Sequence, residues 1–304
     1  MVSHKHFGPS CRAFLSVASI GAHSGAKGVR DIATRCDVVG RSVGPTPSPS
    51  AVRSASRMST LIAAGPLIAG IAVLAASKRA RESFFGFVWS TLGLRTAVHN
   101  SMSGLRAAVL KHAGDLSGRV LEVGSGDGAH LKFLCGPTAP RVRHVTCCEP
   151  NPYFHQRLRR AMDDARLQAA AAGIDVTLRL FPGTLKELVQ SDDGKDGYDV
   201  IACWLVLCSV PDPVAESVRD CARLLKKSGR LLYLEHVAGR GPRLRWLQQF
   251  VQPLYNLLGD GCQLCRETGA ALSDKELPWK RVHHQESEIL GGLLPMVCGV
   301  CVAN

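Results

Sequence analysis

Residues 119–130 read RVLEVGSGDGAH, an apolar stretch followed at once by three glycines within five positions. The apolar part predicts a buried β-strand, and the residues after the glycines continue as a helix. A turn this tight between strand and helix requires residues without Cβ, so that the backbone can lie close to a ligand. Gly124, Gly126 and Ala129 also satisfy the looser dinucleotide fingerprint, and a lone glycine motif is weak evidence. The stretch therefore predicts a ligand-binding turn without identifying the ligand.

A second predicted strand, residues 144–148, is followed by the sequence EPNP at 149–152. A carboxylate at that strand end, 25 residues after Gly124, can accept hydrogen bonds from both ribose hydroxyls of a nucleoside. The alternative for Glu149 is a solvated turn residue, and the glycine turn upstream favours the cofactor contact. Asn151 is suited to cap the helix that follows.

The rest of the chain alternates strands with helices. Further strands are expected at 175–180, 198–204 and 230–235, with helices at 103–112, from 152 to a stop at Gly173, and at 214–225. This alternation predicts a doubly wound α/β sheet, with its ligand crevice at the C-terminal ends of the strands.

The first 57 residues contain ten serines, eight Lys or Arg residues and two acids. Such a composition cannot bury an apolar face, and it is typical of an organellar transit peptide; an ordinary disordered tail is the alternative. The 304-residue chain has a net charge of +12, but 11 of its 37 basic residues and only two of its 25 acids lie in residues 1–81. The remainder is nearly neutral, so we expect no nucleic-acid partner.

Residues 58–77 (MSTLIAAGPLIAGIAVLAAS) carry no charge. As a helix they would be about 30 Å long, the thickness of the hydrocarbon core of a bilayer. We predict a membrane anchor here, with a buried helix or part of a cleaved presequence as alternatives, and an interfacial helix at 83–94. The predicted organisation is a targeting or disordered tail at 1–57, an anchor and interfacial segment at 58–96, and a catalytic domain at 97–304. We expect the protein to be associated with a membrane. A mitochondrion or plastid is favoured over the endoplasmic reticulum or a lipid droplet.

Several segments together resemble one family, the class I S-adenosyl-L-methionine-dependent methyltransferases. They are VLEVGSGDG at 120–128, CCEPNP at 147–152, YDVIACWLVLCSVPDP at 198–213 and LLKKSGRLLYLEHV at 224–237. LVLCSVPDP, LYLEHV and GDGCQLCRET (259–268) are similar to a small branch, the membrane-anchored methyltransferase-like alkyl-thiol S-methyltransferases. The resemblance covers about residues 80–304. It implies a seven-stranded Rossmann-like fold, S-adenosyl-L-methionine as cofactor, and small thiols or hydrogen sulfide as methyl acceptors.

The resemblance also implies the cofactor contacts. Gly124, Gly126 and Gly128 would form the turn beneath the methionine moiety, Glu122 would orient that turn, and Glu149 would hold the ribose. The other expected cofactor-binding residues lie in the same loops and after the third and fourth strands: Ser125, Pro150, Asn151, Thr184, Leu205 and Val206. The family usually has an acid near Thr184, so the adenine contact here would fall to Thr184 or to a backbone amide.

Methyl transfer to sulfur requires a thiolate, and a free thiol is only a few per cent ionised at neutral pH. His236, after the fifth predicted strand, is the candidate general base. The alternative is that Glu235 and His236 only satisfy backbone groups at a strand end. In the loop 259–268, Arg266 would either steer an anionic thiolate or belong to a solvated lid.

The twelve cysteines raise the question of a metal site. Cys262 and Cys265 form one CxxC pair and Cys298 and Cys301 another, with 32 residues between the pairs. That gap exceeds the usual one, and positions three apart on a strand face opposite sides. We therefore assign no metal site, and expect Cys208 near the donor pocket to pack or to act as a reactive thiol.

Three functions stay open on this evidence. The first is a small-thiol S-methyltransferase held at a membrane. The second is a C- or O-methyltransferase of quinone or lipid biosynthesis, and the third is a membrane-bound, zinc-containing interaction protein with a degenerate Rossmann domain. The segments at 204–212 and 259–268 lie on the acceptor side, which favours the thiol enzyme.

Overall fold

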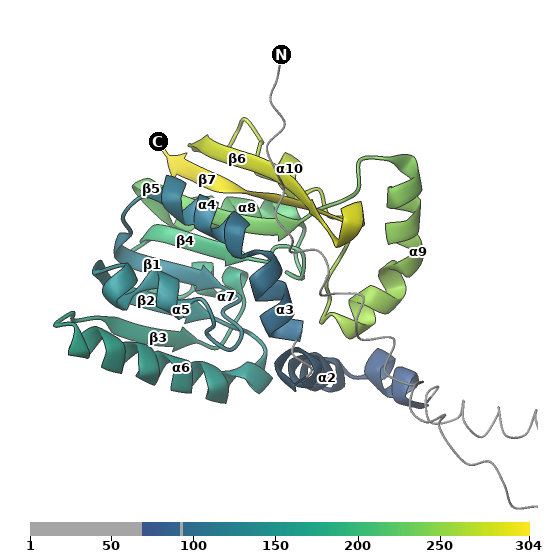
Figure 1. The fold of residues 1–304 in the computed structure, drawn as a ribbon, viewed down its shortest axis with the longest axis horizontal. Helices are drawn as coiled ribbons and strands as arrows, with labels where there is room; N and C mark the ends of the chain where they lie inside the picture. The colour runs from purple at the N-terminus through teal and green to yellow at the C-terminus, as the bar shows by residue number, and fades with distance from the viewer. Residues whose placement is uncertain (1–68, 92–93) are drawn as a thin grey trace, which may run out of the picture. The chain divides into compact units, whose positions relative to one another are not determined.

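The computed structural model describes residues 69–91 and 94–304 (Figure 1). The predicted targeting tail and residues 58–68 of the predicted anchor lie outside the described residues. Residues 69–76 are helical, Ser77 is not, and helix α2 follows at Lys78–Thr91. Within the described ranges, no helix is both long enough and apolar enough to cross a membrane.

Seven strands form one sheet in the order β3-β2-β1-β4-β5-β7-β6 (Figure 1). Their bounds are β1 Ser117–Val123, β2 Arg141–Cys148, β3 Thr177–Phe181, β4 Tyr198–Trp204, β5 Leu225–His236, β6 Trp279–Ile289 and β7 Leu294–Ala303. The first five strands are parallel, and β7 runs antiparallel to both of its neighbours. The expected seven-stranded, Rossmann-like sheet is confirmed.

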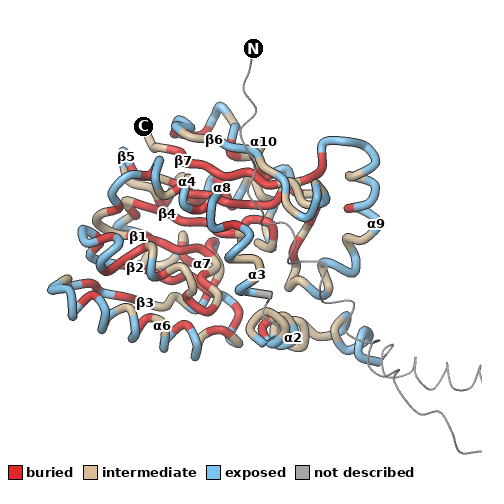
Figure 2. Tube along the Cα trace, in the orientation of Figure 1, coloured by how far each residue is buried: buried red, intermediate tan, exposed pale blue. Residues whose placement is uncertain are grey.

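Helices cover both faces of the sheet. One apolar cluster joins it to α4 Ser103–Ala113, α5 Leu131–Leu134 and α6 Pro152–Ala171, and a second cluster joins it to α7 Leu185–Gln190, α8 Val214–Leu224 and α10 Thr268–Ala271. The remaining helices are α3 Leu94–Ser101, α9 Pro242–Leu258 and short 3₁₀ turns at Gly136–Thr138, Asp192–Gly194 and Leu290–Gly292. In β4, Ala202 belongs to the first cluster while Ile201 and Cys203 belong to the second. The central strands are accordingly buried along most of their length (Figure 2).

Several predicted boundaries agree with the structure. Strand β4 has the predicted bounds, and α6 begins directly after Asn151. Gly173, just beyond the end of α6, has φ +70°, which favours glycine. Strand β5 begins five residues earlier than predicted, because Leu225 already pairs with Tyr198 before the register shifts.

Helix α2 packs against the first turn of α6 (Figure 1). A Cβ at Gly86 would lie 2.1 Å from the ring of Tyr153, so only glycine allows this approach. The ring of Phe85 meets the ring of Phe154 edge-on, with centroids 6.2 Å apart. The predicted interfacial segment 83–94 therefore contacts the predicted catalytic domain through Phe85 and Gly86.

Strands β1 and β4 are neighbours, and the chain continues from them toward opposite edges of the sheet. In open α/β sheets, ligands bind at such a switch point, outside the carboxyl ends of the strands. The loops that follow β1, β2, β4 and β5 are therefore the region in which to examine the predicted site.

Candidate functional site

The glycine turn after β1 contains three glycines with positive φ, at +66° for Gly124, +54° for Gly126 and +82° for Gly128. A Cβ at the first would lie 2.3 Å from the Val206 side chain, and at the third 2.7 Å from Ala161 Cβ. A Cβ at Gly126 would meet no atom within 4 Å. Two glycines therefore permit close packing, and the middle one faces open space that a ligand could fill.

Glu149 follows β2 and is 5% exposed. Its Oε2 accepts a hydrogen bond from the Gly126 N–H at 2.7 Å, and its Oε1 accepts one from the Asn151 N–H at 2.8 Å. Burial raises the pKa of Glu149 to about 7, the two hydrogen bonds oppose that rise, and the charge of Asp260 adds to it. A carboxylate oxygen can accept more than one hydrogen bond, so both retain capacity for a ligand hydroxyl.

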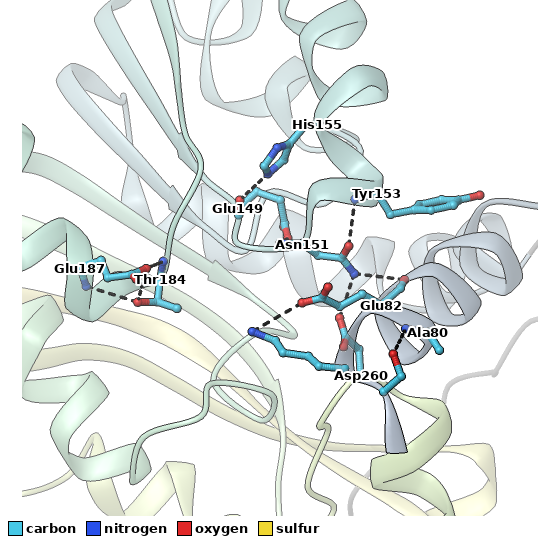
Figure 3. A network of polar contacts seen from close by, with 11 residues as sticks. Ala80, Glu82, Glu149, Asn151, Tyr153, His155, Thr184, Glu187 and Asp260 are labelled. Carbon is cyan, nitrogen blue, oxygen red and sulfur yellow. Dashed lines mark hydrogen bonds and ion pairs between the residues drawn. The ribbon is translucent and has the colours of Figure 1, made fainter. Parts of the chain in front are cut away.

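Asn151 joins three segments of the chain (Figure 3). Its Oδ1 accepts a hydrogen bond from the Tyr153 N–H at 3.0 Å and so caps α6. Its Nδ2 donates to the Glu82 carbonyl of α2 at 3.2 Å and to the Asp260 carboxylate at 2.9 Å. The side chain therefore positions the loop after β2, while Pro150 beside it is exposed.

Glu122 and Ser125 hold the glycine turn from inside. Glu122 is fully buried, and its Oε1 lies 2.9 Å from His130 Nδ1. The Ser125 hydroxyl donates to the Glu122 carbonyl at 3.2 Å. Arg95 of α3 pairs with Asp127 at 2.6 Å. These contacts support the prediction that Glu122 orients the glycine turn.

Thr184 is the N-cap of α7 and forms a capping box with Glu187. Its N–H and its hydroxyl both donate to Glu187 Oε2, at 2.7 and 2.9 Å, and its oxygen accepts from the Glu187 N–H at 3.3 Å. The Thr184 hydroxyl has therefore used its hydrogen as a donor, and its oxygen can only accept a further hydrogen bond. The adenine contact predicted for Thr184 stays a prediction.

The loop after β4 begins with a strained residue, because Leu205 has φ +57°. Its N–H donates to the Leu234 carbonyl at 2.8 Å. Glu235, fully buried at the end of β5, accepts the N–H groups of Val206 and Leu207 at 3.0 and 3.1 Å. Burial raises the pKa of Glu235 to about 8. Positive φ costs a non-glycine residue about 1–2 kcal/mol, and such strain gathers at functional sites.

Arg266 also holds this loop, from the segment 259–268. Arg266 is 7% exposed, and its guanidinium donates to the carbonyls of Leu207 at 3.2 Å, Asp212 at 3.0 Å and Val210 at 2.5 Å. The expectation of a solvated lid is wrong for this residue. These three hydrogen bonds hold the loop after β4 in place, and the steering of a thiolate by Arg266 stays a prediction.

His236 lies in a buried cluster with two cysteines. Its Nε2 is 2.9 Å from Cys262 Sγ, which is 3.4 Å from Cys208 Sγ. Hydrogen bonding by Cys262 holds the pKa of the Cys208 thiol well below its usual range, with help from the charge of His236. Burial lowers the pKa of His236, but the charge of Cys208, a hydrogen bond with Cys208 and the charge of Glu235 together outweigh burial, and the net direction is upward.

The structure connects most of the predicted residues. The glycine turn contacts Val206 through Gly124 and Glu149 through Gly126, and Val206 is held by Glu235, which precedes His236. The cluster of His236 with Cys208 and Cys262 was not predicted. Its members are 28 and 26 residues apart in the sequence, far more than the spacing of a CxxC pair.

Comparisons with known proteins agree with this geometry. The family model described as "Methyltransferase domain" matches residues 96–269. Thiol S-methyltransferase TMT1B of Rattus norvegicus is 30% identical over 211 residues, which are 66% of this chain and 79% of the relative. Thiol S-methyltransferase TMT1A of Homo sapiens is 33% identical over 186 residues, 60% of this chain and 70% of the relative. A ubiquinone biosynthesis O-methyltransferase of Alkalilimnicola ehrlichii is 34% identical over 121 residues, 40% of this chain and 42% of the relative.

These matches favour an enzyme over the predicted alternative of an interaction protein with a degenerate domain. The open space at Gly126 and the buried carboxylate beside it fit a nucleoside cofactor. The chain belongs to the methyltransferase family that uses S-adenosyl-L-methionine as its methyl donor, and it is similar to the thiol S-methyltransferases.

Proposed function

We propose that this chain is a thiol S-methyltransferase that acts on small thiols at a membrane surface. The observation that carries the proposal is the extent of similarity. The thiol S-methyltransferase of Rattus norvegicus is matched over 79% of its length, whereas the ubiquinone O-methyltransferase is matched over 42%. A similarity that extends over most of a relative includes its acceptor side as well as its cofactor half.

On the donor side, the glycine turn and Glu149 would hold the cofactor, with Glu122 and Asn151 as positioning residues. S-adenosyl-L-methionine, when bound, supplies an electrophilic methyl group on a sulfonium. The strained loop that begins at Leu205 would form the wall between donor and acceptor. Glu235 and Arg266 form hydrogen bonds with the backbone of this loop, which therefore has a fixed conformation in the absence of a ligand.

On the acceptor side, a thiol must lose its proton before it can attack. His236 is buried at the end of β5, and its Nδ1 has no hydrogen-bond partner among the described residues. A buried polar atom without a partner is costly, and a ligand or water that bonded to it would remove that cost. His236 therefore has a ring nitrogen available to a ligand, and its role as general base stays a prediction.

The membrane part of the proposal is supported by one face of α9. Trp246, Phe250, Leu254 and Leu258 follow one another at intervals of four residues and are 64%, 71%, 54% and 37% exposed. Residues four apart lie on the same face of a helix. Apolar and aromatic residues with a basic residue nearby, Arg243, suit an anionic bilayer surface, whereas Arg240 and Arg245 already pair with Glu286 and Glu267. We name these four residues the α9 apolar stripe and propose a bilayer as its partner.

The proposed activity is tested by incubating the purified full-length chain with methyl-labelled S-adenosyl-L-methionine. The acceptors are small alkyl thiols, sulfide, and phenolic quinone precursors, each presented separately. We expect label in S-methyl products. Label on the phenolic precursors alone would instead identify a quinone O-methyltransferase, the second candidate, which the 34% identity to the ubiquinone enzyme favours.

A further inference from the structure

We infer that Cys208, His236 and Cys262 form a site for one zinc ion, with a fourth position open to the thiolate of the acceptor. The metal site stands on the geometry of these three residues. The part that concerns the acceptor rests on the proposed function.

The three potential ligand atoms already lie close together. All of them are within 4.8 Å of one another, and all three residues are buried. Zinc binds sulfur at about 2.3 Å and imidazole nitrogen at about 2.0–2.1 Å, so a tetrahedral site separates two sulfurs by about 3.8 Å and a sulfur from a nitrogen by about 3.6 Å. The corresponding distances are 3.4 Å between the sulfurs and 2.9 Å between His236 Nε2 and Cys262 Sγ. To admit the ion, the two sulfurs would have to separate by about 0.4 Å and His236 Nε2 would have to move about 0.7 Å away from Cys262 Sγ.

The backbone arranges these residues from three separate segments. Cys208 lies in the loop after β4, His236 ends β5, and Cys262 lies in the loop after α9. The Gln263 N–H donates to the Cys208 carbonyl at 2.9 Å, which ties the two cysteine loops together. Cys262 itself follows a residue with φ +84°, Gly261. The site is therefore held by backbone contacts that do not depend on the ligand atoms.

The chemistry of the donor set selects a soft divalent ion. Thiolate and imidazole ligands suit zinc, whereas hard cations prefer oxygen. Two buried thiolates without a counter-charge would be unfavourable, and a divalent cation offsets both. The nearby cation Arg266 already donates to three backbone carbonyls. When both cysteines are ionised, a zinc ion would offset the two thiolate charges, and His236 would bind the ion as a neutral ligand.

The other cysteines of the two CxxC pairs do not complete a four-thiolate site. Cys298 and Cys301 belong to the apolar clusters on opposite faces of the sheet, as the strand pattern predicts. Cys265 is not among the residues that gather with Cys262 in the described part of the chain. The inferred site thus has three protein ligands, and three ligands with an open position characterise catalytic zinc sites.

An acceptor thiol would bind at the open position and release its proton to solvent, because coordination to zinc deprotonates a thiol. A lone pair on its sulfur then forms the new bond to the methyl carbon as the bond from that carbon to the sulfonium sulfur breaks. The products are a methyl thioether and S-adenosylhomocysteine, with no change in oxidation state of the metal. In this arrangement His236 acts as a ligand in place of the general base.

Metal content is the first test, because it does not depend on activity. The full-length chain, purified without chelators and then dialysed against zinc-free buffer, should retain about one zinc per chain by elemental analysis. Cys208→Ser and Cys262→Ser should each reduce the retained zinc at least about tenfold. Cys265→Ser is the matched control, three residues from Cys262, and should retain the metal. Circular dichroism shows whether each variant has folded.

Cobalt substitution is the second test. The Co²⁺-loaded chain should show the intense visible bands of a tetrahedral site and sulfur-to-metal charge transfer, and a small alkyl thiol should shift those bands while the corresponding alcohol should not. Wild-type protein without zinc or cobalt bands, or a Cys208–Cys262 disulfide in their place, would overturn the site. Thiol methylation by the metal-free chain at the rate of the zinc-loaded chain would overturn the binding of the acceptor to the metal and keep the proposed function. If a thiol shifts the cobalt bands but no methyl group is transferred to it, the metal site is confirmed and the proposed function is contradicted.

Discussion

Glu149 is the residue whose ionisation should govern cofactor binding. It is buried, and its pKa is raised to about 7. One carboxylate oxygen accepts a hydrogen bond from Gly126 in the glycine turn, and the other accepts one from Asn151. Because the pKa lies above the ordinary value for a carboxyl, the folded chain holds this proton where the unfolded chain releases it. The free protein therefore loses stability from this group as the pH rises through that interval.

Cofactor binding should show the opposite trend with pH, because the carboxylate form accepts hydrogen bonds from the ribose. With a pKa of about 7, affinity for S-adenosyl-L-methionine should weaken about tenfold between about pH 8 and about pH 6. Isothermal titration over that range measures it. Glu149→Gln should bind more weakly and with little dependence on pH. A wild-type affinity that is constant across the range would contradict the assignment.

Gly126 and Gly128 should respond differently to alanine. A Cβ at Gly126 meets open space, so Gly126→Ala should lower the free energy of unfolding only by the strain of positive φ, about 1–2 kcal/mol, yet obstruct the cofactor. A Cβ at Gly128 lies 2.7 Å from Ala161, so Gly128→Ala should lower stability further. Denaturant unfolding and cofactor titration of the two variants separate these effects. Unimpaired binding by the folded Gly126→Ala chain would place the cofactor elsewhere.

At the scale of elements, the sequence predicted those helices and strands whose bounds depend on neighbouring residues. Strand β4 and the cap of α6 follow from neighbouring residues, as Asn151 shows. Strand β6 and helix α9 were not identified, because β6 is an edge strand with few buried residues and α9 contains Pro253 and keeps apolar residues exposed. The cluster at Cys262 could not be predicted, since its three members approach only when the sheet has formed.

The loop after β4 depends on one side chain from another element. Arg266→Ala would leave three backbone carbonyls without their buried donor, and it should lower the free energy of unfolding by about 3 kcal/mol. The control is Arg245→Ala, which removes a surface pair with Glu267 and one hydrogen bond to the Gly239 carbonyl and should cost about 1 kcal/mol. Equal losses of stability in a urea titration would show that Arg266 does not anchor the loop.

For the whole molecule, the prediction concerns attachment to membranes. A chain that begins at Lys78 lacks the predicted anchor and should still bind anionic phospholipid vesicles reversibly through the α9 apolar stripe. Trp246→Glu combined with Phe250→Glu should reduce the bound fraction at least about tenfold in flotation, because charged side chains are excluded from the apolar interface. Leu167→Glu is the control, at a residue of α6 that is 70% exposed. Vesicle binding that is equal in all three chains would remove the stripe as a contact.

Nine of the ten cysteines in the described part of the chain are buried, and Cys265 is partly exposed. Two more, Cys11 and Cys36, lie outside the described residues. With those two replaced by serine, a maleimide fluorophore applied to the native chain would attach at a single position. That position is three residues from Cys262, so the dye's emission would report the arrival of an acceptor as it happens, without radiolabel and without waiting for product.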